Sequence, residues 1–338
     1  MRSKSPFLLL AAAAMVPLPT PASAHSPFEP PEIQANVDEA TRLARTDLAA
    51  ALFFCEANPT AKVTKMLKEG INDWFEPTRI FDNLSYIGNH FVGVFALETD
   101  GGLILFDSGT SLDDAEKHIA PGLAKLGLDP KNIKYIVVTH GHWDHFGGAL
   151  WFQDTYKTPV GLSEIDWKMI ERQEGTPILG GHPIPRRDQV ITDGQTLKVG
   201  STSVKLYITP GHTPGTVSAI FTAKQGGKSH VISLLGSTAF PGTIEPTDIT
   251  GGLARYRESI ARFSKISRQA GADGLLNTHL FAFGGDEKLA RTQASGNGNA
   301  FLIGADGVAR FYGLLDHCMQ ASEARIRAGR AGPGKVGQ

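Results

Sequence analysis

One short segment constrains the fold of this chain more than any other: VVTHGHWDHFGG, at residues 137–148. It follows an apolar, strand-like run and contains three of the chain's 11 histidines beside an aspartate: His140, His142, Asp144 and His145. Imidazole in proteins typically transfers protons near neutral pH or binds a metal. Histidines on alternating positions next to a carboxylate favour metal binding, which requires a fold whose loops converge at the strand ends.

Two further histidines complete the pattern. His212 stands in the glycine- and proline-rich loop TPGHTPG, and His279 follows an apolar run in LLNTHLF. Four ligands in one loop are too many for a single catalytic zinc ion that must keep a water, but they suit two ions that share the loop. We therefore predict two sites with three protein ligands each: His140, His142 and His212 for the first ion, and Asp144, His145 and His279 for the second.

The rest of the chain alternates between strand-like and helical patterns. Buried-looking strands such as residues 133–138 alternate with segments of helical period such as residues 251–270, which predicts an α/β layered domain. We divide the chain into four parts: a signal peptide at 1–24, an N-terminal helical extension at 25–77, the α/β domain at 78–328 and a disordered tail at 329–338.

The N-terminal segment has the features of a secretory signal. MRSK is a basic start, PFLLLAAAAMVPL is apolar but too short to span a bilayer, and Ala22-Ser23-Ala24 has the small-x-small pattern. We expect cleavage after Ala24, with an uncleaved membrane anchor as the alternative. The mature protein is then expected in a bacterial periplasm or secreted, without a membrane partner.

The composition argues against several other classes of function. A net charge of −1 and 20% charged residues give no reason to expect a nucleic acid or an anionic membrane as partner, and there is no GxxxxGK[ST] phosphate loop. We expect a small-molecule substrate, and the oligomeric state stays open.

Export would place the chain where disulfides persist. The two cysteines, Cys55 and Cys318, either tie an N-terminal helix to a C-terminal one or remain as two buried thiols. Neither lies near the histidine cluster in the sequence, so neither is predicted to bind metal.

The pattern H-x-H-x-D-H, followed by TPGHTPG and a strand-end histidine, resembles the metallo-β-lactamase superfamily. IFDNLSYIG and GGLILFDSG resemble the opening strands of that fold, and the resemblance covers residues 78–285. It implies a four-layer αββα sandwich with two zinc ions at one edge, between the sheets. It also implies that Asp107, in LFDSG, supports the metal loop from behind, as such partners fix the orientation of ligating histidines.

The subfamily is indicated by the residue at position 237. Many members, including glyoxalase-type thioesterases, carry a metal-bridging aspartate after this strand, and other β-lactamases carry a cysteine ligand there. Here LLGSTAFPG places Ser237 at this point. A serine with an Asp-His-His second site resembles the third subclass of metallo-β-lactamases, whose members are exported. In that subclass a second hydroxyl residue two places on holds the substrate carboxylate, whereas this chain has Ala239, with Thr238 between.

These features predict an exported zinc-dependent hydrolase. Zinc lowers the pKa of bound water from about 16 to about 7, so a hydroxide held between two ions can attack an acyl carbon at neutral pH. The β-lactam amide bond is the favoured target, and the alternative is a lactone or thioester, as in a glyoxalase II-like enzyme. A metal-binding protein without catalysis and an iron redox protein are further alternatives, although the redox sites normally include the bridging aspartate.

Particular side chains are assigned to catalysis and substrate binding. Asp144 is expected to be both a ligand and the group that orients the hydroxide. Ser237 and Trp143 are predicted to bind substrate, with a buried turn residue and packing beneath the loop as their respective alternatives. His90 and His182 could line the pocket wall, and residues 167–190, rich in glycine and proline, form either a flap over the site or an ordinary surface loop.

Overall fold

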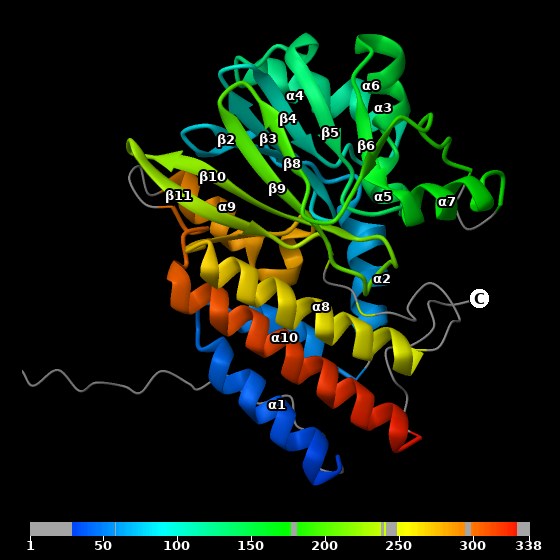
Figure 1. The fold of residues 1–338 in the computed structure, drawn as a ribbon. Helices are drawn as coiled ribbons and strands as arrows, with labels where there is room; N and C mark the ends of the chain where they lie inside the picture. Colours follow the sequence, from blue (N-terminus) through cyan, green and yellow to red (C-terminus); the bar gives the residue numbers. More distant parts are fainter. Residues whose placement is uncertain are drawn as a thin grey trace, which may run out of the picture.

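Two β-sheets face each other in the computed structural model, and helices cover the outer face of each (Figure 1). The structure describes residues 29–57, 59–176, 181–237, 240, 249–294 and 299–329. The predicted αββα sandwich is confirmed. The predicted signal peptide lies outside the described residues, as does the predicted tail from residue 330 on.

The first sheet has seven strands in sequence order: β1 (Thr78–Phe81), β2 (Leu84–Gly88), β3 (Gly93–Thr99), β4 (Gly102–Phe106), β5 (Ile133–Val137), β6 (Val160–Ser163) and β7 (Gln189–Ile191). Strands β1 to β4 pair antiparallel, and β4 to β7 pair parallel. Because β4 and β5 are parallel neighbours, the segments after Phe106 and Val137 leave the sheet at the same edge. This edge receives Asp107 and the histidine loop.

The second sheet has five strands in the order β12 (Gly274–Leu276), β11 (Lys228–Leu234), β10 (Val217–Gln225), β9 (Thr202–Ile208) and β8 (Thr196–Val199). The pairs from β8 to β11 are antiparallel, and β11 pairs parallel with β12. Apolar side chains fill the space between the sheets, where the rings of Phe106 and Phe221 stack with centroids 5.0 Å apart.

Short helices cover the outer face of the first sheet: α3 (Leu112–Asp114), η2 (Ala115–Ile119), α4 (Ala120–Lys125), η3 (Pro130–Asn132), α5 (Trp143–Phe146), α6 (Ala149–Tyr156) and α7 (Glu164–Gln173). Their apolar side chains, including Phe152 and Trp167, are buried in one cluster with Leu105 and Ile136 of the strands. This burial, at about 25 cal/mol per Å² of apolar surface, holds the helices that follow the metal loop in place.

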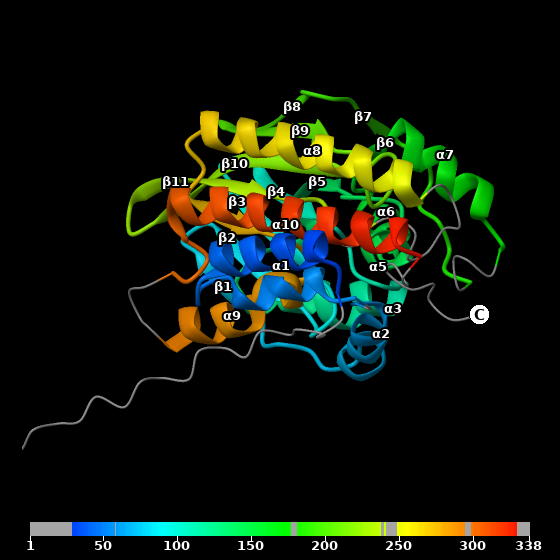
Figure 2. The same cartoon turned by 90° about the horizontal axis from the view of Figure 1, so that it is seen from below.

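The longer helices α8 (Ile249–Gln269) and α10 (Gly304–Arg327) cover the second sheet, and the shorter η5 (Leu280–Phe283) and α9 (Gly285–Ala294) follow β12. The N-terminal extension forms α1 (Pro31–Ala44), η1 (Ala49–Cys55) and α2 (Pro59–Gly70). Helices α1 and α10 lie side by side in both views, Figure 1 and Figure 2. No helix among the described residues is both long and apolar enough to cross a bilayer.

The extension is fixed to the domain by covalent and ionic contacts. Cys55 at the end of η1 and Cys318 in α10 form a disulfide, so the first of the two alternatives for the cysteines holds. Arg310 of α10 forms a bidentate ion pair with Asp47 at 2.6 and 3.0 Å. The buried Arg325 donates to the Cys55 carbonyl and pairs with Glu29. The extension therefore belongs to the folded body of the protein.

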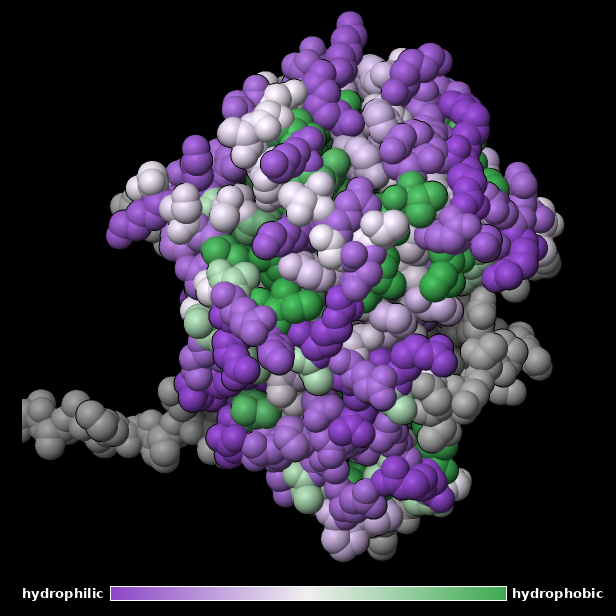
Figure 3. Space-filling view, in the orientation of Figure 1, coloured by the Kyte–Doolittle hydropathy of each residue, from purple (hydrophilic) through white to green (hydrophobic). Residues whose placement is uncertain are grey.

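The visible surface is largely hydrophilic, with hydrophobic side chains in small separate patches (Figure 3). Among the described residues the large hydrophobic side chains that stand exposed are Ile165 and Val190, at 48% and 37%. Scattered exposure of this kind is usual for a folded domain whose apolar residues are packed inside.

Candidate metal centre

Three loops bring the predicted ligands to one edge of the sandwich. The loop after β5 carries His140 and leads into α5, which carries Asp144 and His145. The loop between β9 and β10 carries His212, and His279 follows β12 directly before η5. The six predicted ligands form two groups in space, His140 with His142 and His212, and Asp144 with His145 and His279, each with its ligand atoms within 4.8 Å of one another.

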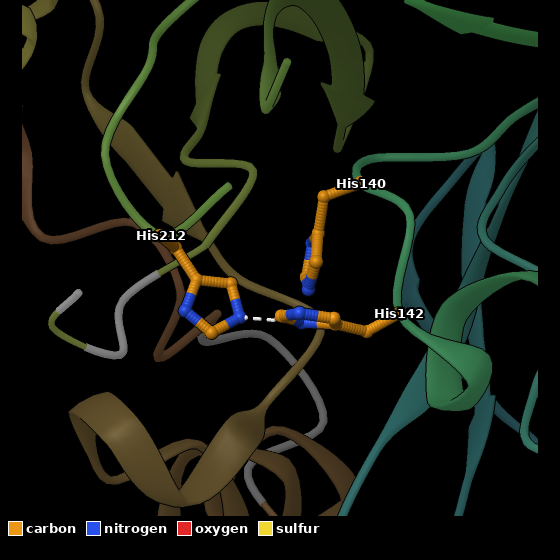
Figure 4. Close-up of side chains that lie close together, drawn as sticks. All are labelled: His140, His142 and His212. Carbon is orange, nitrogen blue, oxygen red and sulfur yellow. Dashed lines mark hydrogen bonds between the residues drawn. The ribbon is translucent and has the colours of Figure 1, made fainter. Parts of the chain in front are cut away.

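The first group consists of three imidazole rings that point toward one another (Figure 4). The centroid of the His140 ring lies 4.8 Å from that of His142 and 4.6 Å from that of His212. His212 Nε2 lies 2.8 Å from His142 Nδ1. Within the described residues, His140 Nε2 is buried without a hydrogen-bond partner. A metal ion bound between the three imidazoles would satisfy this buried nitrogen.

The second group contains one carboxylate and two imidazoles, all buried. Asp144 Oδ2 lies 3.3 Å from His145 Nε2 and 3.4 Å from His279 Nε2, and these two nitrogens are 3.2 Å apart. Asp144 and His145 are consecutive residues of the one-turn helix α5, and His279 follows β12 of the other sheet. The second site is therefore built across the interface of the two sheets.

The nitrogen that faces away from the centre is held by an oxygen in three of the histidines. His140 Nδ1 lies 3.1 Å from the Gly236 carbonyl, His145 Nδ1 lies 2.6 Å from Asp107 Oδ2, and His279 Nδ1 lies 2.8 Å from the carbonyl of Phe91. Because a carbonyl can only accept, Nδ1 carries the proton in His140 and His279, and their Nε2 lone pairs face the centre. Such contacts orient ligating histidines in metalloenzymes.

Burial sets the charge of most of these rings. It lowers the pKa of His140, of His212 and of His279, and it lowers the pKa of His142 to about 4. These four rings are therefore neutral at pH 7, which is the form that binds metals.

His145 behaves differently. Burial alone would lower its pKa, but the carboxylates of Asp144 and Asp107 outweigh that effect and raise the pKa to about 10. The pKa of Asp144 is lowered in turn, because His145 outweighs the cost of burying the carboxylate. The second group thus favours positive charge at its centre. Five imidazoles and one carboxylate fit two zinc ions, since zinc prefers nitrogen donors with some carboxylate.

Asp107 lies behind the loop that follows β5 and carries His140 and His142, where the resemblance to the family placed it. It is fully buried, and its backbone has φ +66°, a left-handed conformation that aspartate tolerates better than most residues. Oδ1 accepts the Thr139 backbone N–H at 2.7 Å, and Oδ2 accepts the Thr139 hydroxyl at 3.0 Å as well as contacting His145. One carboxylate thus holds both the start of the loop and one of its rings.

The two predicted substrate contacts lie in different surroundings. Ser237 is buried directly after Gly236, and within the described residues its hydroxyl has no hydrogen-bond partner. Its carbonyl accepts the Tyr256 hydroxyl. Trp143 is half-buried and its indole stacks on the His182 ring, with centroids 4.8 Å apart and planes 6° from parallel. Thr238 and Ala239 lie outside the described residues.

The structure also locates His90 and the stretch at 167–190, which the sequence left as a possible pocket wall and a possible flap. His90 packs on Phe75 and lies 3.1 Å from Asp286, outside both groups of predicted ligands. The stretch at 167–190 begins inside helix α7, which Ser163 caps by accepting the Asp166 backbone N–H. Residues 177–180 of that stretch lie outside the described residues.

Sequence reasoning missed Asp166, a fully buried carboxylate beside the first group. Its Oδ2 accepts the Gly141 backbone N–H at 2.9 Å and the Thr213 hydroxyl at 2.6 Å. A signal was present, because Ser163 and Asp166 form an S-x-x-D pattern that marks a helix start. That pattern predicts a helix terminus and does not indicate contact with a distant loop.

Comparison with known proteins gives one family. The family model of the metallo-beta-lactamase superfamily matches residues 87–226. An uncharacterized protein of Mycobacterium leprae is 33% identical over 168 residues, covering 43% of this chain and 72% of the relative. A probable metallo-hydrolase of Bacillus subtilis, YqgX, is 27% identical over 170 residues, covering 49% of this chain and 74% of the relative.

Solved structures of the same family have the same fold. BJP-1, a subclass B3 metallo-beta-lactamase of Bradyrhizobium japonicum, superposes with a TM-score of 0.62 at 25% identity, covering 72% of this chain and 92% of that one. A metallo-beta-lactamase of Cronobacter sakazakii superposes with a TM-score of 0.63 at 27% identity, covering 77% and 98%. Since sequence, fold and metal-ligand geometry agree, this chain belongs to the metallo-β-lactamase superfamily and is a metal-dependent hydrolase.

Proposed function

We propose that this protein is an exported dizinc β-lactamase of the subclass B3 type. The observation that carries the proposal is the donor set of the second group, Asp144 with His145 and His279, combined with a serine at position 237. The likeness to a subclass B3 enzyme at 25% identity supports the same subclass.

The reaction adds one water across the ring amide, breaks its C–N bond and leaves a carboxylate and an amine. His140, His142 and His212 would hold one zinc ion, and Asp144, His145 and His279 would hold the other. Bound there, the ions would supply Lewis-acid activation of water and of the carbonyl oxygen. The chain's own part is to hold the ligands. The Gly236 carbonyl, Asp107 and the Phe91 carbonyl fix the rings of His140, His145 and His279, so little reorganisation is needed during the reaction.

Asp144 is proposed as the catalytic carboxylate. Its Oδ2 faces the Nε2 atoms of both histidines of its group, and its pKa is lowered, so it stays ionised at neutral pH. An ionised carboxylate at this place accepts a hydrogen bond from the attacking water and orients it.

Ser237 and Trp143 are proposed to bind the substrate. The Ser237 hydroxyl is available to donate to the substrate carboxylate, because within the described residues nothing else uses it. Trp143 precedes Asp144 in the chain and forms a flat aromatic surface with His182. We propose that this stacked pair packs against the apolar substituent of the acyl side.

Export is proposed on two grounds. The first 24 residues have the features of a signal peptide, and the Cys55–Cys318 disulfide is of a kind that persists in oxidising compartments. Cell fractionation tests this point: the proposal expects the mature chain, shortened by the signal, in the periplasm or medium. Full-length chain in the cytoplasm would contradict it.

The substrate is tested with a chromogenic cephalosporin. The purified, zinc-loaded mature protein should open the ring rapidly, and a chelator should abolish turnover until zinc is returned. A protein that holds two zinc ions per chain yet leaves cephalosporin, penicillin and carbapenem intact would contradict the β-lactam substrate.

A second candidate function is hydrolysis of a lactone or thioester with the same metal centre. It is favoured by Ala239, which stands two places after Ser237, where the resemblance to the third subclass calls for a hydroxyl residue that holds the β-lactam carboxylate. The zinc-loaded protein should then cleave a chromogenic thioester or lactone and not the cephalosporin.

A further inference from the structure

Asp166 connects the two loops that form the three-histidine group. Gly141, whose N–H it accepts, stands between His140 and His142 in the chain, and Thr213, whose hydroxyl it accepts, follows His212. Every proposed ligand of the first metal therefore lies next to a residue that this carboxylate holds. The two loops come from different sheets, since one follows β5 and the other joins β9 to β10.

Helix α7 presents Asp166 rigidly. Ser163 caps the helix, so Asp166 stands in its first turn, where the helix dipole stabilises a negative charge. Met169 and Ile170, three and four residues further on, pack against Gly141, because a methyl group added to Gly141 would come 2.7 and 3.0 Å from their side chains. The metal loop thus rests on one face of α7.

The loop that carries His212 packs against α7 as closely as the loop of His140 and His142 does. A methyl group on Gly215 would collide with Ser163 Oγ and Asp166 Oδ1, so this glycine of TPGHTPG is required by the approach to α7. Thr213 is buried, and its hydroxyl also lies 2.9 Å from that of Thr216, which closes the loop on itself. Both the helix that carries Asp166 and the loop that carries Thr213 are therefore shaped for this contact.

We propose that Asp166 is a positioning residue for the three-histidine metal site. Its carboxylate fixes the distance between the loop of His140 and His142 and the loop of His212. It does for the first site what Asp107 does for the second, but through backbone and hydroxyl groups next to the ligands. This inference rests on the assignment of the first group as a metal site and is independent of the substrate.

The test measures zinc affinity at each site separately, with a chromophoric chelator as competitor. His279→Ala leaves the three-histidine site intact, and His140→Ala leaves the Asp-His-His site intact. Adding Asp166→Asn should raise the zinc Kd of the three-histidine site about 10- to 100-fold and change that of the other site less than about threefold. Asp166→Asn keeps the shape of the side chain but removes its charge and one acceptor oxygen.

The control is Glu164→Gln, which removes a carboxylate from the same helical turn. The Glu164 side chain is 43% exposed and pairs with Lys168 and Arg187. The Glu164→Gln substitution should leave the zinc affinities of both sites unchanged. If Asp166→Asn fails to fold, Thr213→Val removes one of the two donors and should weaken the first site selectively by a smaller factor.

Equal weakening of both sites by Asp166→Asn, or no weakening of the three-histidine site, would overturn the proposal. A wild-type protein that binds zinc but hydrolyses no β-lactam would refute the proposed substrate and leave this inference intact. A wild-type protein that binds no zinc would refute the metal assignment itself.

Discussion

Individual residues at this centre work in pairs, a proposed ligand in front and an oxygen behind it. His140, His145 and His279 each turn Nε2 to the centre, because Nδ1 faces the oxygen of Gly236, Asp107 or Phe91. Two of these three oxygens are backbone carbonyls. The orientation of the rings is thus set by the path of the chain as much as by side chains.

Replacing His140 by alanine should remove the first metal and most of the hydrolytic activity, because two ligands cannot hold an ion in a site built for three. Zinc content per chain and turnover are the measurements. His118→Ala is the matched control, since His118 is exposed and stacks on Trp74, outside both groups. A His140→Ala protein with full turnover would contradict the ligand assignment.

Replacing Asp107 by asparagine should weaken zinc binding at the Asp-His-His site by about 10- to 100-fold, because the carboxylate that orients His145 loses its charge. The affinity of the three-histidine site should change much less. Competition with a chelator in the His140→Ala background measures the effect. An unchanged affinity there would show that Asp107 only supports the loop.

Among the elements, the N-terminal extension packs on α10, and both share the main hydrophobic core with the two sheets. Helix α1 lies along α10, and the segment after α1 is joined to α10 by the Asp47–Arg310 ion pair and the Cys55–Cys318 disulfide. Next to the disulfide, Phe53 and Phe54 contact each other, and Phe53 contacts Phe281, two residues beyond His279. The extension therefore supports the segment that carries one of the proposed ligands.

Removing the disulfide by Cys55→Ala and Cys318→Ala together should lower the free energy of unfolding by about 2–5 kcal/mol, because the bond closes a long loop in the unfolded chain. Denaturant titration of the metal-free protein measures this loss. The same titration with dithiothreitol should reproduce it in the wild type and leave the double variant unaffected. Equal stability of the two proteins would contradict a formed disulfide.

The Asp47–Arg310 pair predicts a dependence on pH. The hydrogen bonds from Arg310 lower the pKa of Asp47 below its ordinary value near 4, so the pair stabilises the fold above that pH. This contribution is lost as pH falls through the lowered pKa. Because Asp47 is partly exposed and solvent screens the pair, we expect only about 1 kcal/mol.

Asp47→Asn should therefore destabilise the protein at pH 7, and the difference from wild type should shrink toward pH 2. Denaturant midpoints across that range measure it. Asp38→Asn, on the exposed face of α1, serves as control. A difference that stayed constant with pH would rule out the ion pair as its cause.

For the whole molecule, the sequence predicts the αββα fold and the family because their signals are local. The strand before His140 and the spacing H-x-H-x-D-H lie within thirteen residues, 133–145. The alternation of strands and helices then places the ends of parallel strands at a common edge. The prediction failed to include contacts that depend on how distant segments approach.

Asp166 and Phe91 show why such contacts are hard to predict. Phe91 meets His279, 188 residues away, through its ring and through its backbone carbonyl, and a carbonyl has no sequence signature. Asp166 reaches Gly141 and Thr213 because α7 packs against both loops. The Cys55–Cys318 pairing likewise depends on η1 meeting α10, so the sequence left two alternatives open.

The central claim is that one edge of the sandwich holds two metal ions in two separate groups of three ligands. The most direct test is the zinc content per chain of the purified protein after dialysis, by elemental analysis. The account predicts two zinc ions in the wild type and one in each of His140→Ala and His279→Ala. A wild-type chain that retains one ion or none, with its fold intact, would contradict it.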